Sequence, residues 1–489
     1  MRRTQRRGAT MDIQAGLERA FHPKVVAVVG AKQDNDYMWL RAHGPFKEFG
    51  GKVYHVNIDE REWPGAEELG FQNVSSILDI PEPVDYVAIS VPNVVVPRVL
   101  QDCATKGVGG AHIFAAGFAE TGTEQGQQLE DAVYQIATEG DFLVIGPNGM
   151  GLYNPALGIR PGRDVPYGET DGYFSFLSQS GTTAMSIASG APANGIAVSK
   201  GVSFGNGTVV DATDYLRYYA ADEATEVIGM YLEGVNDGPA FFEALREAAA
   251  RKPVLVWKVG STTESARAGF AHTRSEAVPS ELWDAMLTVC GAIKVSSIEE
   301  MLETAMALRV VGDPGVNAAL IAVSGGHSGK IADVFGQQGF HIPAPSPESI
   351  EEIASYAEIE GGSFSNPIEG PSARGPERLG RTLGVLARDD NFDLLVAEFG
   401  AGAVKQDDNA LAERIEVLQQ VRDEQPDKPI VTVLSTDIPY VEGVDIQGVA
   451  REFFEAGLPC FLSMERGAVA LRKAREFQQR STWLLPNSA

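Results

Sequence analysis

The sequence predicts an α/β protein in which three parallel-sheet units follow one another along the chain. The 489 residues give room for about three domains of ~150 residues each. Continuous apolar runs rich in β-branched residues, such as VVAVVG at 25–30, are typical of strands buried on both faces of a parallel sheet. These runs alternate with helix-length segments, and the alternation restarts twice.

The composition is that of an acidic globular protein. Hydrophobic residues make up 44% and charged residues 22%, and the formal net charge is −26 at pH 7. This charge argues against nucleic acid or an anionic membrane as the main partner, although helix N-termini with a few local cations can still hold an anionic ligand. Cys103, Cys290 and Cys460 form no CxxC pair, which favours buried thiols in a reducing compartment.

We expect residues 1–20 to form a disordered lead. Their basic start, MRRTQRRGATMDIQ, has no apolar run behind it and is therefore unlike a secretory signal. No stretch of the chain approaches 18 apolar residues, so the sequence predicts no transmembrane helix and no membrane partner. We expect a cytoplasmic protein.

Residues 21–150 are predicted to form a doubly wound domain of Rossmann type, because strand candidates alternate with helical segments such as VVPRVLQDCATKG. The strand candidates are Pro23–Lys32, Lys52–Asn57, Asp85–Ser90, Gly110–Gly117 and Asp141–Gly149. Such sheets bind nucleotide-like ligands at the carboxyl ends of their strands. The residues at these ends are Gly30-Ala31-Lys32, Val91-Pro92, Ala116-Gly117 and Gly146-Pro147-Asn148.

The turn after the first strand has two interpretations. Gly30-Ala31 allows a close approach of a ligand, or simply makes a tight turn from strand to helix. The turn is not GxGxxG, and no ribose-binding acid is evident, which argues against a hydride-transfer cofactor.

Residues 151–172 are rich in Pro and Gly and are predicted to be a linker, after which a second α/β domain spans 173–312. Its strand candidates are Gly172–Gly181, Gly195–Gly205, Thr225–Val235 and Pro253–Gly260. The first of them runs into SQSGTT, Ser178–Thr183, which opens a helix. Hydroxyls and free N–H groups at a helix start form an anion site, although an ordinary serine N-cap has the same pattern.

His272 lies on a predicted loop between the strand Pro253–Gly260 and a helix that begins near Ser280. An imidazole there could act as a base, a metal ligand or a covalent phosphoryl carrier, or could be a polar loop residue without a chemical role. Glu233 and the Ser178–Thr183 turn are predicted at the same sheet edge. A carboxylate beside His272 would orient the ring and make one of its nitrogens more nucleophilic.

Residues 313–489 are predicted to form a flavodoxin-like α/β domain. Its strand candidates are the start of Asn317–Gly329, then Gly339–Pro345, Phe392–Gly400, Lys428–Ser435 and Leu458–Ser463. The first ends in GGHSG, Gly325–Gly329, which either cradles a phosphate or makes a plain glycine turn. His327 is therefore a second candidate catalytic histidine, although the sequence shows no evident acid partner for it.

Motifs from all three units match one known family. They are PKVVAVVGA, FAAGFAETGTEQG, VIGPNGMGLYNP, FLSQSGTTA, YLEGVNDG, ARAGFAHT and FSNPIEGP. Together they resemble the NDP-forming acyl-CoA synthetase family, the relatives of succinyl-CoA synthetase, over about Phe21–Arg480, and specifically its α-subunit portion. The resemblance implies a CoA-binding Rossmann-type domain followed by two flavodoxin-like (succinyl-CoA synthetase-like) domains.

The resemblance also implies site residues. Contacts with coenzyme A carry over to Gly30, Ala31, Lys32, Val91, Pro92, Ala116, Gly117, Glu120 and Asn148. Contacts with phosphate carry over to Ser178, Gln179, Ser180, Gly181 and Thr182. His272 becomes the phosphorylated histidine and Glu233 its orienting carboxylate, and no metal ligand is implied. The implied reaction reversibly converts a carboxylate, CoA and ATP or GTP into acyl-CoA, ADP or GDP and phosphate, through an acyl phosphate and phosphohistidine.

The sequence departs from the family pattern at several positions. Thr273-Arg274 follows His272 where Thr-Gly is usual, Gly149 stands where a cysteine is common, and Lys32 where serine is usual. The matched residues include no ATP-grasp portion. The resemblance therefore implies that Mg-ATP (or GTP) is bound by a separate ATP-grasp β-type subunit in a hetero-oligomer.

Two other functions stay open. One is a non-catalytic protein that binds CoA or acyl-CoA, and the other is a nucleotide-independent acyl-CoA enzyme that uses His272 as a base. Phe270 and Trp283 either line an acyl pocket or pack in a core. Phosphorylation of His272 would favour the ligase over both alternatives.

Overall fold

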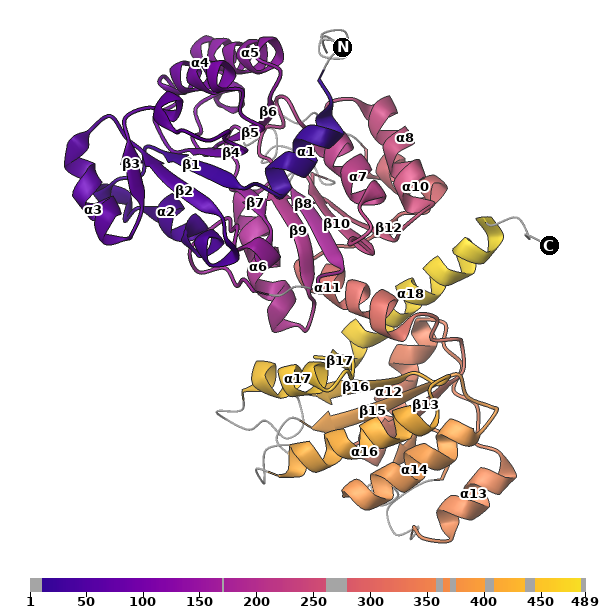
Figure 1. The fold of residues 1–489 in the computed structure, drawn as a ribbon. Helices are drawn as coiled ribbons and strands as arrows, with labels where there is room; N and C mark the ends of the chain where they lie inside the picture. Colours follow the sequence, from indigo (N-terminus) through magenta and orange to yellow (C-terminus); the bar gives the residue numbers. More distant parts are fainter. Residues whose placement is uncertain are drawn as a thin grey trace. The chain divides into compact units, whose positions relative to one another are not determined.

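The computed structural model describes residues 11–168, 171–260, 279–357, 364–369, 375–400, 409–435 and 445–484. The chain forms two compact units: Met1–Pro192 with Ile196–Ile298, and Ala193–Gly195 with Glu299–Ala489. In Figure 1 the first runs from indigo to pink and the second from orange to yellow. The first two predicted domains thus share one unit.

A six-stranded parallel sheet forms the first part of the first unit, in the order β3-β2-β1-β4-β5-β6. The order reverses beside β1, as in dinucleotide-binding sheets, which confirms the predicted Rossmann-type domain. β1 is buried along its whole length because its sequence, VVAVV, has no polar side chain. The strands are β1 Val25–Val29, β2 Lys52–Val56, β3 Gln72–Val74, β4 Tyr86–Ile89, β5 Gly110–Ile113 and β6 Leu143–Ile145.

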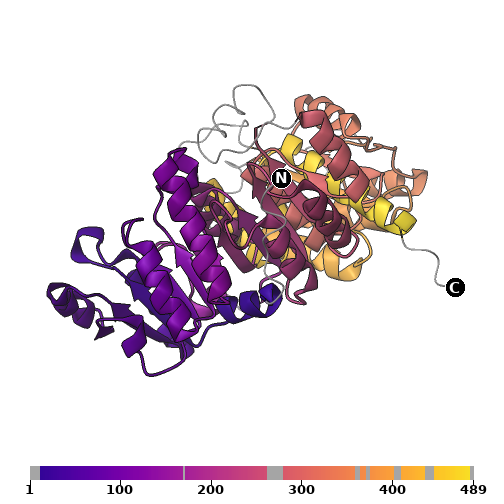
Figure 2. The same cartoon turned by 90° about the horizontal axis from the view of Figure 1, so that it is seen from above.

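Helices connect these strands, and α4 and α5 lie side by side over the sheet (Figures 1 and 2). The helices are α2 Met38–His43, α3 Trp63–Glu68, α4 Val96–Lys106 and α5 Glu124–Glu139. The sequence analysis missed β3 because its residues, QNV, contain no apolar run.

The predicted disordered lead at 1–20 is wrong for its second half, because Ile13–Phe21 form helix α1. Asp12 caps this helix by accepting a hydrogen bond from the Ala15 N–H at 3.0 Å. Its fully buried residues are Leu17, Ala20 and Phe21. Their i, i+3, i+4 spacing gives the helix an apolar face, which the basic residues before it obscured in the sequence.

The second sheet of the first unit has the order β12-β11-β10-β8-β9-β7. Strands β8 to β12 are parallel and have a flavodoxin-like order that reverses between β8 and β10, as predicted. The strands are β7 Gly151–Tyr153, β8 Phe174–Ser178, β9 Val198–Ser203, β10 Val227–Leu232, β11 Val254–Lys258 and β12 Ile293–Lys294. The helices are α6 Gly181–Ala193, α7 Ala212–Ala221, α8 Gly238–Ala249 and α10 Ser280–Cys290.

The predicted linker 151–172 begins with a strand. Gly151–Tyr153 form β7, which pairs antiparallel with β9 at the edge of the second sheet. Leu152 and Tyr153 are buried there, so their apolar side chains outweigh the Pro and Gly content of the segment.

The second unit contains a five-stranded parallel sheet in the order β14-β13-β15-β16-β17, which is again flavodoxin-like. Its strands are β13 Ala318–Ala322, β14 Ile368–Glu369, β15 Leu394–Gly400, β16 Ile430–Ser435 and β17 Cys460–Phe461. Helices α14 and α16 lie side by side on one face in Figure 1, and α12 contacts α18. The helices are α11 Ile298–Met306, α12 Gly325–Gln337, α13 Pro347–Ala354, α14 Pro376–Arg388, α16 Ala410–Glu424, α17 Ile446–Glu455 and α18 Met464–Leu484.

The strand predicted at 339–345 is wrong. Only an isolated bridge between Asn317 and His341 forms there. Pro343 and Pro345 lack the N–H groups that a strand needs, and the Pro343 carbonyl oxygen instead accepts a hydrogen bond from Asn366 at 2.9 Å. The edge strand beside β13 is β14.

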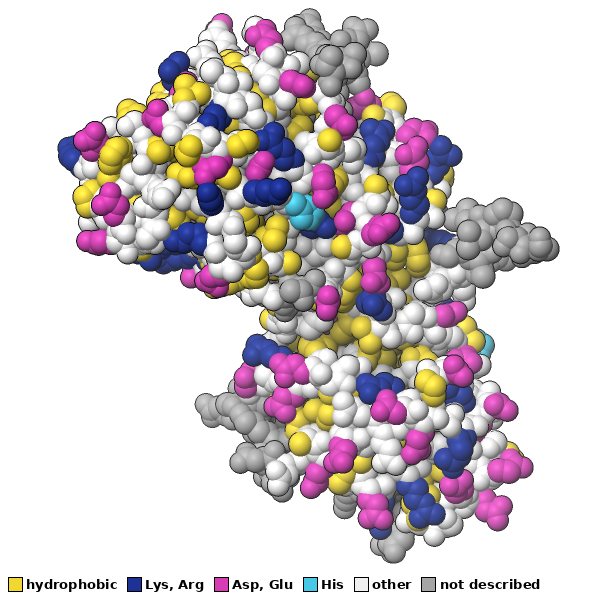
Figure 3. Space-filling view, viewed as in Figure 1, with side chains coloured by type: hydrophobic (Ala, Val, Ile, Leu, Met, Phe, Trp, Pro, Cys, Tyr) yellow, Lys and Arg dark blue, Asp and Glu magenta, His cyan; other side chains and the backbone are white. Residues whose placement is uncertain are grey.

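One continuous hydrophobic core joins the first two sheets, and the second unit has a core of its own. Within the described ranges, no helix combines the length and the apolar character needed to span a bilayer. On the face shown in Figure 3, acidic side chains are scattered among basic ones on both units rather than gathered in one patch.

Candidate functional site

Each sheet of the first unit has one point where its strand order reverses, and open α/β sheets bind ligands at the carboxyl edge of that point. In the first sheet, Gly30 follows β1 and Val91 lies after β4. In the second sheet, Ser178 ends β8 and Glu233 follows β10. We build the candidate site from these two edges.

Gly30 makes the turn that brings the end of β1 against the end of β4. Its φ is +82°, and a Cβ there would lie 2.5 Å from Val91 Cγ1 and 2.7 Å from the Ser90 carbonyl oxygen. The next residue, Ala31, is fully buried, and its carbonyl oxygen accepts a hydrogen bond from His55 Nε2 at 2.9 Å. A side chain is therefore excluded at residue 30, which fits both a tight turn and a close ligand approach.

Lys32 is exposed after the end of β1, and after the end of the neighbouring β4 Val91 is half-buried and Pro92 exposed. Its ammonium group lies 3.0 Å from Asp34 Oδ2, and this hydrogen bond raises the Lys32 pKa. Because an exposed ion pair contributes little to stability, the ammonium group is free to exchange Asp34 for a phosphate oxygen.

Glu120 fixes the turn at Ala116-Gly117. Its carboxylate accepts hydrogen bonds from the backbone N–H groups of Gly117 and Phe118 and, at 2.7 Å, from Asn206 Nδ2. Asn206 follows β9, so this bond joins the carboxyl edges of the two sheets. Glu120 thus has a positioning role in this structure. The sequence analysis missed Asn206, although the GNG run at 205–207 was a signal for it.

Asn148 and Gly149 lie at another contact between the two sheets. Asn148 has φ +59°, and its backbone N–H donates to the Ala115 carbonyl oxygen at 3.0 Å. A Cβ on Gly149 would lie 2.6 Å from the Ser203 carbonyl oxygen at the end of β9. A cysteine at residue 149 would require a backbone shift, which explains physically why this chain has glycine there.

The turn after β8 combines a serine cap with free N–H groups. Ser180 Oγ accepts a hydrogen bond from the Thr183 N–H at 3.3 Å, and the buried Ser178 hydroxyl bonds to the Ser180 backbone. Gly181 and Thr182 begin α6, and N–H groups in a first turn have no acceptor within the helix. The ordinary N-cap and the features of an anion site therefore occur together here.

Gln179 ties this turn to Glu233. Its Oε1 accepts hydrogen bonds from the backbone N–H groups of Glu233 at 2.5 Å and Gly234 at 2.9 Å. The structure thus brings together the turn and Glu233, which the sequence predicted at one edge. A cavity of about 10 Å³ beside Gln179 has room for about one water molecule.

Lys258, the last residue of β11, belongs to the same edge and was missed by the sequence analysis. Burial lowers the Lys258 pKa, and the charge of Glu233, which is 7% exposed, opposes this shift. The ammonium group lies 5.2 Å from the centre of the Trp283 ring. Trp283 is buried, so it has the core-packing role. A lysine that ends the apolar strand VLVWK was the available signal.

His272 lies outside the described residues, as do its neighbours Phe270, Thr273 and Arg274. The structure describes the strand before this stretch and helix α10 after it, which begins at Ser280. The pairing of His272 with Glu233 therefore stays a prediction. In the part of the chain that is described, no three His, Cys, Asp or Glu side chains form a group that could hold a metal ion.

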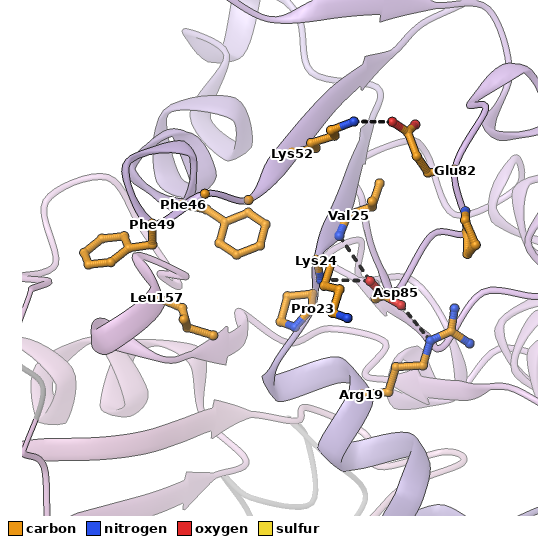
Figure 4. A pocket seen from close by; sticks show the side chains of 13 residues that line it. Arg19, Pro23, Lys24, Val25, Phe46, Phe49, Lys52, Glu82, Asp85 and Leu157 are labelled. Atoms are coloured by element: carbon orange, nitrogen blue, oxygen red, sulfur yellow. Dashed lines mark hydrogen bonds and ion pairs between the residues drawn. The ribbon is translucent and has the colours of Figure 1, made fainter.

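A cavity of about 680 Å³ opens at the opposite, amino edge of the first sheet (Figure 4). Asp85 accepts hydrogen bonds there from Arg19 and from the backbone N–H groups of Lys24 and Val25. None of the predicted site residues lines this cavity.

Comparison with known proteins identifies the family. Two family models match: a CoA binding domain over residues 24–155 and a succinyl-CoA ligase like flavodoxin domain over residues 171–308. The ADP-forming acetate–CoA ligase I subunit alpha of Pyrococcus furiosus is 31% identical over 93% of this chain and 96% of its own length. The chain belongs to the NDP-forming acyl-CoA synthetase family. The predicted resemblance to the α-subunit portion is confirmed.

Some members of the family are longer. The ADP-forming acetate–CoA ligase I of Archaeoglobus fulgidus is 35% identical over 78% of this chain, which matches 54%, about half, of that relative's length. A crystal structure from Pyrococcus horikoshii OT3 has a TM-score of 0.79 at 28% identity, covering 95% of this chain and 99% of its own. An acetyl-coenzyme A synthetase from Ca. Korarchaeum cryptofilum has a TM-score of 0.81 at 24% identity, covering 97% and 99%, and supports the fold.

Proposed function

We propose that this chain is the α-type component of an NDP-forming acyl-CoA synthetase, which makes acyl-CoA from a carboxylate, CoA and ATP. The relatives named ADP-forming acetate–CoA ligase support this reaction class. The observation that carries the proposal is the second sheet's edge, where Gln179 links the start of α6 to Glu233 and the neighbouring strand β11 ends in Lys258.

The chemistry of this edge suits phosphoryl transfer. The first-turn N–H groups at Gly181 and Thr182 and the ammonium group of Lys258 supply donors and positive charge for phosphate oxygens. Glu233 orients His272, whose free ring nitrogen attacks the γ-phosphorus of ATP, so that the N–P bond forms, the bond from phosphorus to the bridging oxygen breaks and ADP leaves. In the synthetic direction the phosphoryl group passes from His272 to the substrate carboxylate. The CoA sulfur then attacks the carbonyl carbon of the acyl phosphate, the C–S bond forms, and phosphate leaves.

The first sheet's edge fits the other substrate. Its Gly30 turn admits a close backbone approach, and the exposed Lys32 provides a cation for the phosphates of coenzyme A. The remaining strand ends of this sheet are followed by Val91, Pro92, Ala116, Gly117 and Asn148. Because Asn206 and Ser203 connect this edge to the second sheet, both substrates would meet within one compact unit.

The nucleotide step requires a partner. We propose that Mg-ATP (or GTP) is bound by an ATP-grasp β-type subunit, which phosphorylates His272 in a hetero-oligomer. Two Pyrococcus furiosus relatives carry the name subunit alpha, which supports a divided enzyme, whereas the chain matches about half of the longer Archaeoglobus fulgidus relative.

Peptide mass analysis of the chain after incubation with an ATP-grasp β-type subunit and Mg-ATP tests this proposal. We expect an acid-labile addition of about 80 Da on the His272 peptide, absent from His272→Ala. CoA binding without this addition would instead establish the binding-protein alternative. Acyl-CoA turnover that needs His272 but no nucleotide would establish the nucleotide-independent enzyme.

A further inference from the structure

The second unit contains a histidine–glutamate pair that its sequence did not reveal. His327 lies in the first turn of α12, directly after β13, and its Nδ1 is 2.9 Å from Oε1 of Glu398 on the adjacent strand β15. The sequence showed no evident acid partner for His327, and the fold supplies one. The two residues are 71 positions apart, so only the fold brings them together.

Glu398 is held firmly. Its side chain is fully buried, and its Oε2 accepts a hydrogen bond from the Val323 N–H at 3.0 Å. The hydroxyl of Ser435, at the end of β16, donates to the same Oε1 that contacts His327. A buried carboxylate is costly unless it is paired, and these contacts offset that cost and fix its orientation. The imidazole ring is therefore oriented by a carboxylate that has no freedom to turn away.

The second nitrogen of the His327 ring is Nε2. When neutral histidine donates its Nδ1–H to Glu398, the lone pair is left on Nε2. The His327 side chain is 11% exposed, and the described residues make no hydrogen bond to Nε2. A Cβ on Gly326 or Gly329 would meet no atom within 4 Å, so the helix start has open space at these two residues.

A second carboxylate borders the same turn. Oε2 of Glu369, at the end of β14, would lie 2.9 Å from a Cβ placed on Gly325. Its negative charge opposes the approach of an anion, whereas the first N–H groups of α12 favour it. The two glutamates of this site therefore have opposite expected effects: Glu398 activates the imidazole, and Glu369 repels an anionic reactant.

We propose that His327, oriented by Glu398, is a second phosphoryl-accepting histidine that reacts with a small acyl phosphate. Nε2 attacks the phosphorus atom, the N–P bond forms, the bond from phosphorus to the acyl oxygen breaks, and the carboxylate leaves with that electron pair. The Nδ1 proton stays in the hydrogen bond to Glu398, which stabilises the positive charge that develops on the ring. The proposed function supplies the acyl phosphate, so the inference rests on it for its biological donor.

The test uses acetyl phosphate as the phosphoryl donor. The full chain is incubated with acetyl phosphate, without ATP or any partner, and phosphohistidine is mapped in peptides under conditions that preserve it. We expect label on His327 in the wild type and in His272→Ala, and none at that position in His327→Ala. Label confined to His272, or no label on a folded chain, would overturn the inference. Because the ligase test uses Mg-ATP, a β-type subunit and His272, either proposal can fail alone.

Two variants distinguish a positioning role of Glu398 from a role in folding alone. Glu398→Gln should reduce the labelling rate of His327 by about tenfold or more, and Glu369→Gln should raise it about twofold. Nitrogen NMR of the His327 ring should show the Nδ1–H tautomer in the wild type and its loss in Glu398→Gln. A structural role alone would lower labelling in both variants with no change of tautomer. If Glu398→Gln does not fold, the wild-type map and Glu369→Gln still decide the question.

Discussion

The second and third sheets repeat one arrangement with different chemistry. In each, the strand order reverses beside the first strand, and a turn and a helix follow that strand: β8 and α6 in one, β13 and α12 in the other. The neighbouring strand carries a glutamate, Glu233 after β10 and Glu398 in β15. The next strand ends in Lys258 in the second sheet and in Ser435 in the third.

The difference lies in what balances the glutamate. In the second sheet the neighbouring strand ends in the cation Lys258, whose pKa burial lowers and the charge of Glu233 raises, and the turn contains only Ser, Gln, Gly and Thr. In the third sheet neutral donors and an imidazole from the turn itself contact Glu398. The fold therefore supplies the helix start and the carboxylate in both places, whereas individual side chains decide whether the turn itself contributes a histidine, as in the third sheet, or not, as in the second.

Replacing each of the two glutamates in turn is the strongest test of this comparison. Glu233→Gln should lower phosphorylation of His272 by Mg-ATP and a β-type subunit about 100-fold and leave His327 labelling by acetyl phosphate unchanged. Glu398→Gln should lower His327 labelling by about tenfold or more and leave phosphorylation of His272 unchanged. Glu243→Gln, which removes an exposed acid on α8, is the control for charge alone. If Glu233→Gln lowers labelling at both histidines, the two edges do not act separately.

Removing the cation of the second sheet should have the next largest effect. Lys258→Met should lower acyl-CoA synthesis about 10- to 100-fold and raise the KM for phosphate in the reverse reaction, because phosphate loses a charged donor. Burial lowers the Lys258 pKa below 10.5, so wild-type turnover should fall as the pH rises through that lowered pKa.

The pH profile of Lys258→Met should lack this alkaline fall. The control is Lys294→Met on β12, which loses an exposed pair with Asp284 at 2.7 Å and should keep wild-type turnover and pH profile. Equal losses in the two variants would show that Lys258 acts only through the overall charge.

The two turns also differ in how they cap their helices. Ser180 Oγ accepts a hydrogen bond from the Thr183 N–H, whereas Ser324, the N-cap of α12, makes no side-chain cap bond. We expect Ser180→Ala to lower the stability of the first unit by about 1 kcal/mol and Ser324→Ala to leave the second unit unchanged. Thermal unfolding followed by calorimetry measures both, and a larger loss in Ser324→Ala would contradict the difference.

These contrasts show which parts of the site the sequence could predict. Strand runs such as VVAVV and the SQSGTT turn are local patterns, so most strands of each sheet and the place of Glu233 at a strand end followed from the sequence. The short edge strands β3, β7, β12 and β14 did not. The contact between His327 and Glu398, and that between Glu120 and Asn206, join residues far apart in the chain. Only the pairing of strands places such side chains together, and α1 was missed because the basic residues before it obscured its apolar face.

The smallest difference between the two sheets is expected when glycines near the starts of α6 and α12 are replaced by alanine. Gly329 lies in α12, and a Cβ there would meet no atom within 4 Å, so Gly329→Ala should stabilise the second unit by about 0.5–1 kcal/mol through helix propensity. A Cβ on Gly181 in α6 would lie 2.8 Å from Met150 Cγ, so Gly181→Ala should gain nothing unless this flexible side chain moves. The same calorimetric measurement compares them. Equal increases in the free energy of unfolding would mean that the Met150 side chain moves aside at no cost. The start of α6 would then be no more tightly packed than that of α12.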